Sequence, residues 1–204
     1  GATVISNVDN LNRPLLLYRQ LLQWLGGIGI VVLVLAILPI LGVGGMYLYK
    51  AETSSPVKDN KLSPRITETA KSLWGVYIVL TIACAVLYKI AGMSYFDAIG
   101  HSFSTVSIGG FSTHDASIGF YSSDLIKIIC MVFMFLSALN FVLHFLFYKN
   151  KSLTVYTSNS EMKSFLLIII ILLLLVAIFS TGGRTQSLEN IDIMFHILSF
   201  ATTS

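Results

Sequence analysis

The sequence predicts an all-α integral membrane protein assembled from repeated units, each with two spanning helices and a short re-entrant helix between them. Three observations support this class. Of the 204 residues, 55% are hydrophobic and 11% are charged, whereas soluble domains carry about 25% charged residues. Four apolar stretches are long enough to cross a membrane. Two shorter apolar stretches each end in a turn rich in hydroxyl side chains.

The four long apolar stretches are expected to be spanning helices. They cover residues 21–44, 73–91, 125–147 and 165–179, the last completed by its flanks, and a helix needs about 20 residues to cross a core of about 30 Å. The shorter stretches, 95–106 and 188–201, would rise only about 20 Å at about 1.5 Å per residue. We expect these two to enter the membrane and turn back, because non-helical backbone is tolerated at depth only beside protein or water.

The distribution of positive charge predicts the orientation. Five of the thirteen Lys and Arg side chains lie at residues 50–71 and three at 149–163, and an excess of Lys and Arg marks cytoplasmic loops. The short helices and their polar turns then fall on the external side. That side carries slightly more acidic than basic groups, which suits the entry of a cation.

An internal repeat divides the chain. At an offset of 95, Asp97, His101 and Ser104 align with Asp192, His196 and Ser199, and residues 106–109 align with 201–204. Residues 1–3 resemble 110–112, and residues 23–29 resemble 134–140. The predicted divisions are the end of a first unit at 1–50, a loop at 51–72, a complete second unit at 73–147, a loop at 148–163 and the start of a third unit at 164–204. The chain is expected to be a piece of a longer protein.

The turn after each short helix has the chemistry of a cation filter. A dehydrated cation needs oxygen ligands, which filters supply mostly from backbone carbonyls. Glycine permits positive φ and so lets carbonyls point inward, and a helix that ends before the turn aims its negative end at the ion path. The segment Ser104 to Asp115 combines two glycines with several hydroxyls. Taken alone, such a segment is equally typical of an ordinary external loop.

Three motifs resemble the Trk/Ktr/HKT superfamily of potassium transporters, and in particular its bacterial TrkH/TrkG branch. They are residues 1–5 (GATVI), 23–30 (QWLGGIGI) and 104–115 (STVSIGGFSTHD). The resemblance extends over the whole chain and implies four potassium-channel-like M1–pore helix–M2 units around one pore, with one filter glycine in each. It also implies a homodimer, a TrkA-like cytoplasmic nucleotide-binding subunit as partner, and K⁺ as the transported ligand. This chain would cover the first to the third filter.

Carried over by position, the resemblance makes Gly1 and Gly110 the filter glycines of the first two units. Glycine at both positions implies a preference for K⁺, and Gly109 is expected to be a replaceable neighbour. The predicted K⁺-binding set is Gly1, Ala2, Ser107, Ile108, Gly109, Gly110, Phe111, Thr202, Thr203 and Ser204. Backbone coordination of K⁺ is assigned to Gly1, Ile108, Gly109, Gly110, Thr202 and Thr203. The flanking hydroxyls are expected to supply supporting oxygens.

Several other residues are expected to have structural roles. His101 and His196 are predicted to brace the short helices by hydrogen bonds to a neighbouring span. Asp97 follows Ser94 by three residues, which is the spacing of a capping box, and Asp192 repeats its position. Small residues at 26, 27, 29, 137 and 138 favour close approach between helices or onto a filter. Cys84 and Cys130 lie in apolar stretches and are expected to be buried thiols, not a disulfide or metal pair.

The sequence therefore predicts the pore subunit of a K⁺ uptake system in the bacterial cytoplasmic (inner) membrane. Two alternatives remain open: a secondary transporter with a substrate site between broken helices, and a membrane scaffold that conducts nothing. Coupling to H⁺ or Na⁺ is left undecided. No nucleophile with a base, phosphate loop or thiolate cluster supports an enzyme, and no covalent cofactor is expected. The net charge of +3 is too small to favour nucleic-acid binding.

Overall fold

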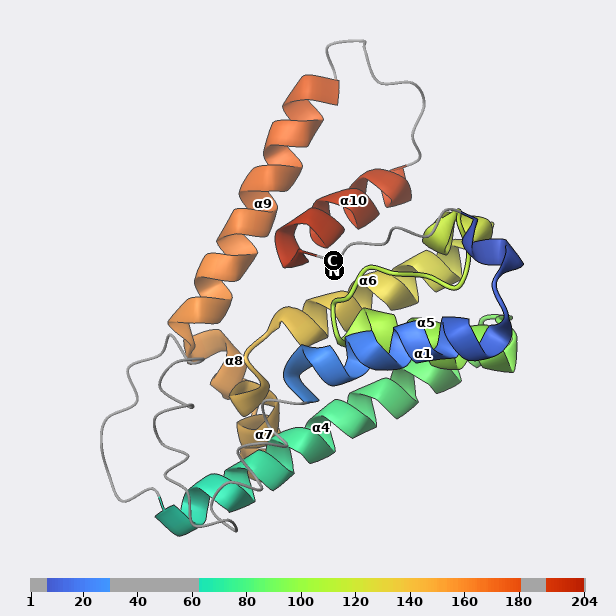
Figure 1. Ribbon diagram of the computed structural model, residues 1–204. Coiled ribbons are helices and arrows are strands. Elements are labelled where there is room, and N and C mark those ends of the chain that lie inside the picture. Colours follow the sequence, from blue (N-terminus) through green and yellow to red (C-terminus); the bar gives the residue numbers. More distant parts are fainter. Residues whose placement is uncertain (1–6, 30–62, 181–189, 204) are drawn as a thin grey trace.

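The computed structural model describes residues 7–29, 63–180 and 190–203, and throughout these ranges the regular structure is helical (Figure 1). This confirms the predicted all-α class. The α-helices are α1 (Arg13–Trp24), α4 (Ser63–Ile90), α5 (Tyr95–Val106), α6 (Asp124–Ala138), α7 (Phe141–Asn150), α8 (Thr154–Ser158), α9 (Ser160–Ser180) and α10 (Asn190–Thr202). Three shorter helical segments complete the order. Segment η1 (Val8–Asn10) precedes α1, η2 (Leu25–Gly29) follows α1, and η3 (Ser117–Phe120) lies between α5 and α6.

Helices α4 and α5 form the centre of the second unit. Tyr77, Cys84 and Tyr88 are completely buried on one face of α4, at helical spacing, while Val79, Ile82, Val86 and Ile90 on other faces are more than half exposed. Gly92, with φ of 107°, reverses the chain before α5, which begins and ends as predicted for 95–106. Helix α4 packs against α5, which lies beside α1 (Figure 1). The buried face of α4 thus supports the short helix.

The third predicted span is not one helix. It is divided into α6 and α7, which meet at an angle of 91°. Leu139 is extended, with φ of −75° and ψ of 151°, and the Asn140 side chain accepts a hydrogen bond from the Val142 backbone N–H as the N-cap of α7. Prediction of a single helix over 125–147 was wrong, because apolar composition says nothing about a cap that ends one helix and begins another.

The remaining predicted spans are described to different extents. By length and composition, the described part of the chain holds one helix that can cross a membrane, Lys71–Ile90 within α4, or two if α6 and α7 count as one span. Helix α9 contains the predicted stretch 165–179. Of the stretch 21–44, only the end of α1 and η2 fall within the described residues. There the chain breaks from helical geometry at Gly27, with ψ of −149°.

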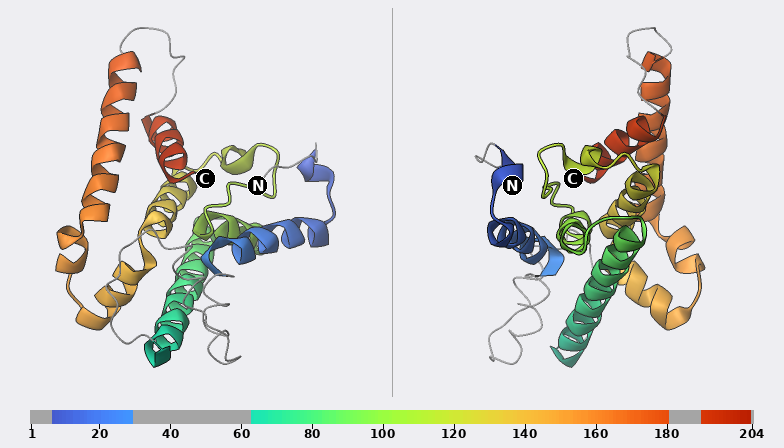
Figure 2. Two further views of the ribbon diagram at one scale, coloured as in Figure 1. Left: turned by 60° about the vertical axis from the view of Figure 1, so that its left-hand side comes forward. Right: turned by 90° about the vertical axis from the view of Figure 1, so that its right-hand side faces the viewer.

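The short helix of the third unit packs against the second unit. Helix α10, predicted at 188–201, lies along α6 and also contacts α9 (Figures 1 and 2). Lys127 in the first turn of α6 forms an ion pair with Asp192 in the first turn of α10, with 2.6 Å between Nζ and Oδ1. This ion pair joins the start of α10 to the start of α6.

Candidate ion-filter site

The start of α5 is fixed by a capping box. The Ser94 hydroxyl oxygen accepts from the Asp97 backbone N–H at 3.1 Å and donates to the Asp97 carboxylate at 2.7 Å, as predicted from the spacing. Asp97 also accepts from the Thr113 hydroxyl at 2.8 Å. Burial opposes ionisation of this carboxyl, but the hydrogen bonds and the nearby His114 outweigh it and lower the Asp97 pKa below its ordinary value. Asp97 therefore ties the external start of α5 to the segment beyond the turn.

The turn after α5 has an alternating backbone. Ile108 has φ of 54° and Gly110 has φ of 75°, whereas Gly109 between them is not left-handed. A left-handed conformation is uncommon for a bulky residue such as isoleucine, and the surrounding hydrogen bonds enforce it: the Ile108 N–H donates to the Thr105 carbonyl at 3.2 Å, and the Gly109 N–H to the Ser104 carbonyl at 2.8 Å. Successive peptide groups are therefore rotated relative to one another, as a carbonyl-lined filter requires.

The turn after α10 repeats this geometry at the predicted offset of 95. Thr203, the counterpart of Ile108, has φ of 62°, and its N–H donates to the Phe200 carbonyl just as the Ile108 N–H donates to that of Thr105. The Thr202 hydroxyl donates to the Ser199 carbonyl at 3.3 Å, matching the bond from Ser107 to Ser104 at 3.2 Å. The repeat seen in the sequence is thus a repeat of turn geometry.

Most hydroxyl groups of the second turn are used inside the protein. Ser104 donates to Gln23 at 3.0 Å, Ser107 to the Ser104 carbonyl at 3.2 Å, and Thr113 to Asp97 at 2.8 Å. Thr105 lies 2.8 Å from the Tyr88 hydroxyl and 3.8 Å from the Cys130 sulfur. The sequence suggested these hydroxyls as supporting oxygens for an ion. In the structure they hold the turn in shape, which leaves the backbone carbonyls as the stronger candidates for ion ligands.

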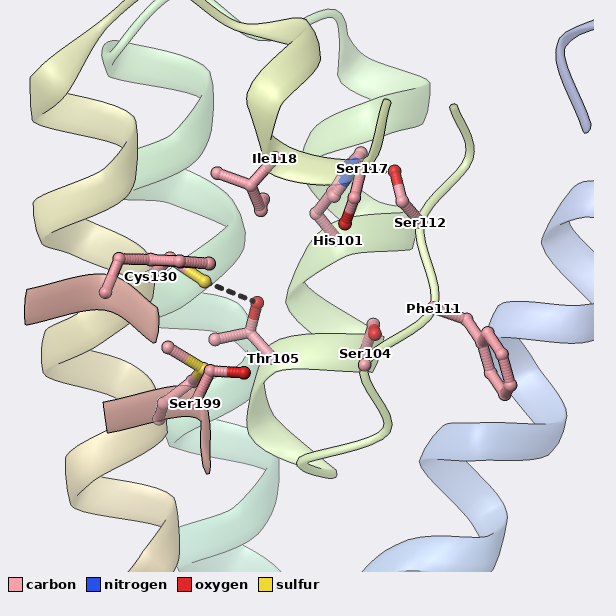
Figure 3. Close-up of a pocket in the computed structure, with 12 residues that line it drawn as sticks. His101, Ser104, Thr105, Phe111, Ser112, Ser117, Ile118, Cys130 and Ser199 are labelled. Carbon is pink, nitrogen blue, oxygen red and sulfur yellow. Dashed lines mark hydrogen bonds between the residues drawn. The ribbon is translucent and has the colours of Figure 1, made fainter. Parts of the chain in front are cut away.

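His101 braces the turn, but through a different partner from the one expected. Its Nδ1 lies 2.9 Å from the Asp97 carbonyl and its Nε2 lies 2.8 Å from the Ser112 hydroxyl. Because a carbonyl can only accept, Nδ1 carries the proton and the hydroxyl donates to Nε2. The expected bond to a neighbouring span was wrong. His101 instead fastens the segment after the turn to α5, and Figure 3 shows its ring beside Ser112.

His196 does not repeat this brace within the described residues. It is exposed on α10, and its ring contact is with the adjacent Phe195. The register places the counterpart of Ser112 at position 207, past the last residue of the 204. Asp192 likewise differs from Asp97, since it pairs with Lys127 and not with a serine cap.

Helix α1 lies directly against the second turn. A Cβ added to Gly27 would come within 2.9 Å of the Ser107 Cβ and of the Tyr77 hydroxyl oxygen, and one added to Gly109 would lie 2.1 Å from the Gln23 Oε1. Close approach at Gly27 was predicted, although Gly26 has open space beside it. Gly109 was expected to be replaceable; a larger residue there would require the Gln23 side chain to shift.

A cavity separates the second turn from α10. Its lining includes Gly110 and Ser104 from the second turn and α5, Cys130 and Met134 from α6, and Phe195 and Ser199 from α10. Figure 3 shows Ser199 on one side of this space and Ser104 on the other, with Phe111 directed away toward α1. Cys84 and Cys130 are both free and buried, as predicted. The predicted site residues Gly1, Ala2 and Ser204 lie outside the described residues.

Sequence reasoning missed a second layer of polar residues around the turn. Gln23 contacts Ser104 and Phe111, and His114 lies 2.9 Å from the Asp9 carboxylate and 3.4 Å from that of Asp97. The Val8 N–H donates to Asp115 at 2.7 Å. Gln20 and Gln23 could have been noticed as two amides three residues apart in an apolar stretch. One partner of His114, Asp9, is 105 residues distant in the chain and left no local signal.

Comparison with known proteins identifies the family. The pattern of the TrkH family, described as cation transport protein, matches residues 1–203. The chain belongs to the TrkH family. It is 51% identical over 207 residues to the Trk system potassium uptake protein TrkH of Halomonas elongata, covering 100% of this chain and 43% of that protein. It is 55% identical over 166 residues to the protein of that name from Escherichia coli strain K12, covering 81% of this chain and 34% of that protein.

A solved TrkH-family structure has the same fold. The crystal structure of the potassium transporter TrkH from Vibrio parahaemolyticus superimposes with a TM-score of 0.77 at 43% identity, covering 100% of this chain and 40% of that chain. The chain thus spans less than half the length of these TrkH-family relatives. Membership places it among membrane transport proteins and confirms the resemblance drawn from the three motifs.

Proposed function

We propose that the protein to which this chain belongs takes up K⁺ across the bacterial cytoplasmic membrane, and that the turns after α5 and α10 are two of its filters. The observation that carries the proposal is that a left-handed residue recurs at Ile108 and at Thr203. Each follows a short helix, and the two helices align at the offset of 95 residues. Names given to the relatives, Trk system potassium uptake protein, support K⁺ as the ion. Gly110 and the carbonyls of residues 108–110 and 202–203 are the proposed ligands.

The same proposal extends to the assembly. The resemblance to Trk-type systems favours a homodimer that works with a TrkA-like cytoplasmic nucleotide-binding subunit. The Lys-rich segment at 50–71 is a candidate contact for such a subunit. Gly1, Ala2 and Ser204 are proposed to complete the first and third filters.

The alternative of a transporter that binds substrate between broken helices is less well supported. Backbone carbonyls freed at such breaks would have to face a substrate. Here the Trp24 carbonyl at the first break accepts from the Tyr77 hydroxyl at 2.8 Å, and the Leu136 carbonyl at the second lies 2.9 Å from the His144 Nε2. Both of these carbonyls are satisfied within the protein and are not available to a substrate.

Replacing Gly110 with serine in the full-length protein tests the filter. A side chain at φ of 75° costs on the order of 1 kcal/mol and rotates the peptides on either side. We expect Gly110→Ser to reduce the ratio of K⁺ to Na⁺ uptake in cells or vesicles at matched protein level. Gly119→Ser is the control, because Gly119 is exposed and has no neighbouring atom within 4 Å of an added Cβ. Equal ion selectivity in both variants would contradict the filter assignment.

A further inference from the structure

We infer that Gln23, at the end of α1, is a positioning residue for the second filter: its side-chain oxygen holds the Phe111 amide and thereby directs the Gly110 carbonyl. The inference deepens the proposed function and rests on it. Gln23 belongs to the second helix of the first unit, whereas the turn belongs to the second unit. One unit would therefore set the geometry of the filter in the next.

A single oxygen of Gln23 contacts both ends of the turn. Its Oε1 accepts from the Ser104 hydroxyl at 3.0 Å and from the Phe111 backbone N–H at 3.3 Å. Ser104 lies in the last turn of α5, and Phe111 directly follows the proposed filter glycine. The loop from 105 to 110 is closed between these two bonds. Movement of the turn would break at least one of them.

The bond to Phe111 determines where the preceding carbonyl points. The peptide joining Gly110 to Phe111 is trans, and in a trans peptide the C=O and N–H point in opposite directions. With the Phe111 N–H directed at Gln23, the Gly110 carbonyl must point away from α1. Gly110 borders the cavity that Ser199 lines from the other side. The carbonyl is thus turned from α1 toward the interior of the molecule, where the proposed ion path lies.

A second amide orients the first. The Gln23 Nε2 donates to the Gln20 Oε1 at 3.4 Å, which leaves the Gln23 oxygen for the turn. Gln20 is completely buried, and its Nε2 has no hydrogen-bond partner in the described part of the chain. A buried donor without a partner costs about 1–3 kcal/mol. An apolar side chain would fill this position without that cost, so packing alone does not explain the pair of amides.

The position that corresponds to Gln23 in the next repeat is occupied by a methionine. In the alignment of residues 23–29 with 134–140, Gln23 corresponds to Met134, which is buried and lines the same cavity as Ser199, the counterpart of Ser104. A thioether is only a weak acceptor. An amide thus contacts the second turn, whereas a side chain with only a weak acceptor occupies the corresponding position beside the cavity that Ser199 lines.

The test uses the full-length protein in vesicles, with K⁺ and Na⁺ uptake measured at matched protein level. Gln23→Met removes the strong acceptor and reproduces the residue found in the next unit. We expect it to lower the K⁺ to Na⁺ ratio on the order of tenfold, the factor that corresponds to one hydrogen bond of about 1.4 kcal/mol. Gln23→Glu keeps an acceptor oxygen and should retain most of the selectivity. Leu22→Met, at a half-exposed neighbour, is the control.

Two outcomes separate this inference from the proposed function. If Gly110→Ser alters selectivity and Gln23→Met does not, the role of Gln23 is overturned and the filter stands. If neither alters it, the filter itself fails. Hydrogen exchange of the Phe111 amide reports the contact independently of transport: Gln23→Met should accelerate it and Gln23→Glu should not. Unchanged exchange in Gln23→Met would overturn the contact.

A double-variant experiment checks the same contact from the other side. Gly109→Ala places a methyl group against the Gln23 amide, so it should impair selectivity in the presence of Gln23. Shortening the side chain by Gln23→Ala removes the two nearest atoms, Oε1 and Cδ, and the added effect of Gly109→Ala should then be several-fold smaller. Strictly additive effects would show that the two residues do not act on each other.

Discussion

Two adjacent glycines in the second turn are required for different physical reasons. Gly110 has φ of 75°, a conformation that glycine adopts without a steric penalty. Gly109 does not have a left-handed backbone, but a side chain there would displace its neighbour Gln23. The first reason belongs to the residue's own backbone, and the second to a helix from another unit. The two glycines are thus constrained by different factors: Gly110 by its own backbone conformation, and Gly109 by the side chain of Gln23.

A second residue-scale feature is the carboxylate of Asp97, which joins the start of α5 to the segment after the turn. It accepts from Ser94 and Thr113 and lies near His114. Because these contacts favour the ionised form, the Asp97 pKa is lowered from 3.8. A lowered folded-state pKa contributes stability that is present above the ordinary value and is lost as pH falls through the lower one.

Asp97→Asn should therefore change both stability and its pH dependence. At neutral pH we expect a loss of about 1 kcal/mol, since hydrogen bonds to a charged group are stronger than those to a neutral one. As pH falls below 3.8, the midpoint of thermal unfolding should decline more in the wild type than in the variant. Parallel curves for the two purified full-length proteins would contradict an ionised Asp97 in the fold.

At the scale of the element, the second helix of a unit is a broken helix and not a straight rod. The break between α6 and α7 is built from side chains on both sides of it. Asn140 caps α7, and His144 lies 2.9 Å from the Leu136 carbonyl and 2.8 Å from the Tyr156 hydroxyl. Since the carbonyl only accepts, the His144 Nε2 carries the proton and the Tyr156 hydroxyl donates to Nδ1. Helix ends at a break need such partners because their backbone groups lose their intrahelical bonds.

Removal of the cap at the break should destabilise the bent geometry. We expect Asn140→Ala to cost about 1 kcal/mol, the usual value of an N-cap, which corresponds to roughly 2–4 °C in the midpoint of thermal unfolding. Asn140→Ser retains a capping oxygen and should stay close to the wild type. The measurement is thermal unfolding of the full-length protein in detergent. An alanine variant as stable as the serine variant would show that the cap does not hold the break.

Across the whole molecule, apolar packing builds each unit, and polar contacts as well as apolar ones join successive units. Tyr77, Tyr88, Met93 and Met134 are buried within the second unit. Links between units include polar contacts: Gln23 to the second turn, His114 to Asp9, and Lys127 to Asp192. The last of these has additional support from Asp124, 3.6 Å from the Lys127 nitrogen. Such contacts fix the register of one unit against the next, which apolar surfaces alone specify weakly.

Exchange of the charges at Lys127 and Asp192 tests the link between the second and third units. Lys127→Asp alone and Asp192→Lys alone each place like charges together and should lower the midpoint of thermal unfolding. The double exchange restores an attractive pair and should recover most of that loss, less completely at high salt, because salt screens exposed charges. A double variant no more stable than the worse single variant would argue against the pair.

Local features of the sequence predicted most of the helices and the repeat. The length of apolar runs determined α4, α5, α9 and α10 to within a few residues, apart from the polar first turns that extend α4 and α9. The capping box at Ser94 was visible because it needs only two residues three apart. The offset of 95 predicted which positions would share a turn conformation. Each of these depends on neighbours in the chain, which a sequence displays directly.

Contacts between distant segments were decided by the tertiary structure alone. Gln23 reaches Phe111 over a separation of 88 residues, and nothing near either residue marks the pair. Apolar composition concealed the break at Leu139, and the roles of the turn hydroxyls depended on which groups folding brought beside them. By itself the sequence determined most of the helices, the repeat and the place of the turn that we propose as a filter. Only the packed helices decided how that turn is held, because a hydrogen bond depends on distance in space and not on position in the chain.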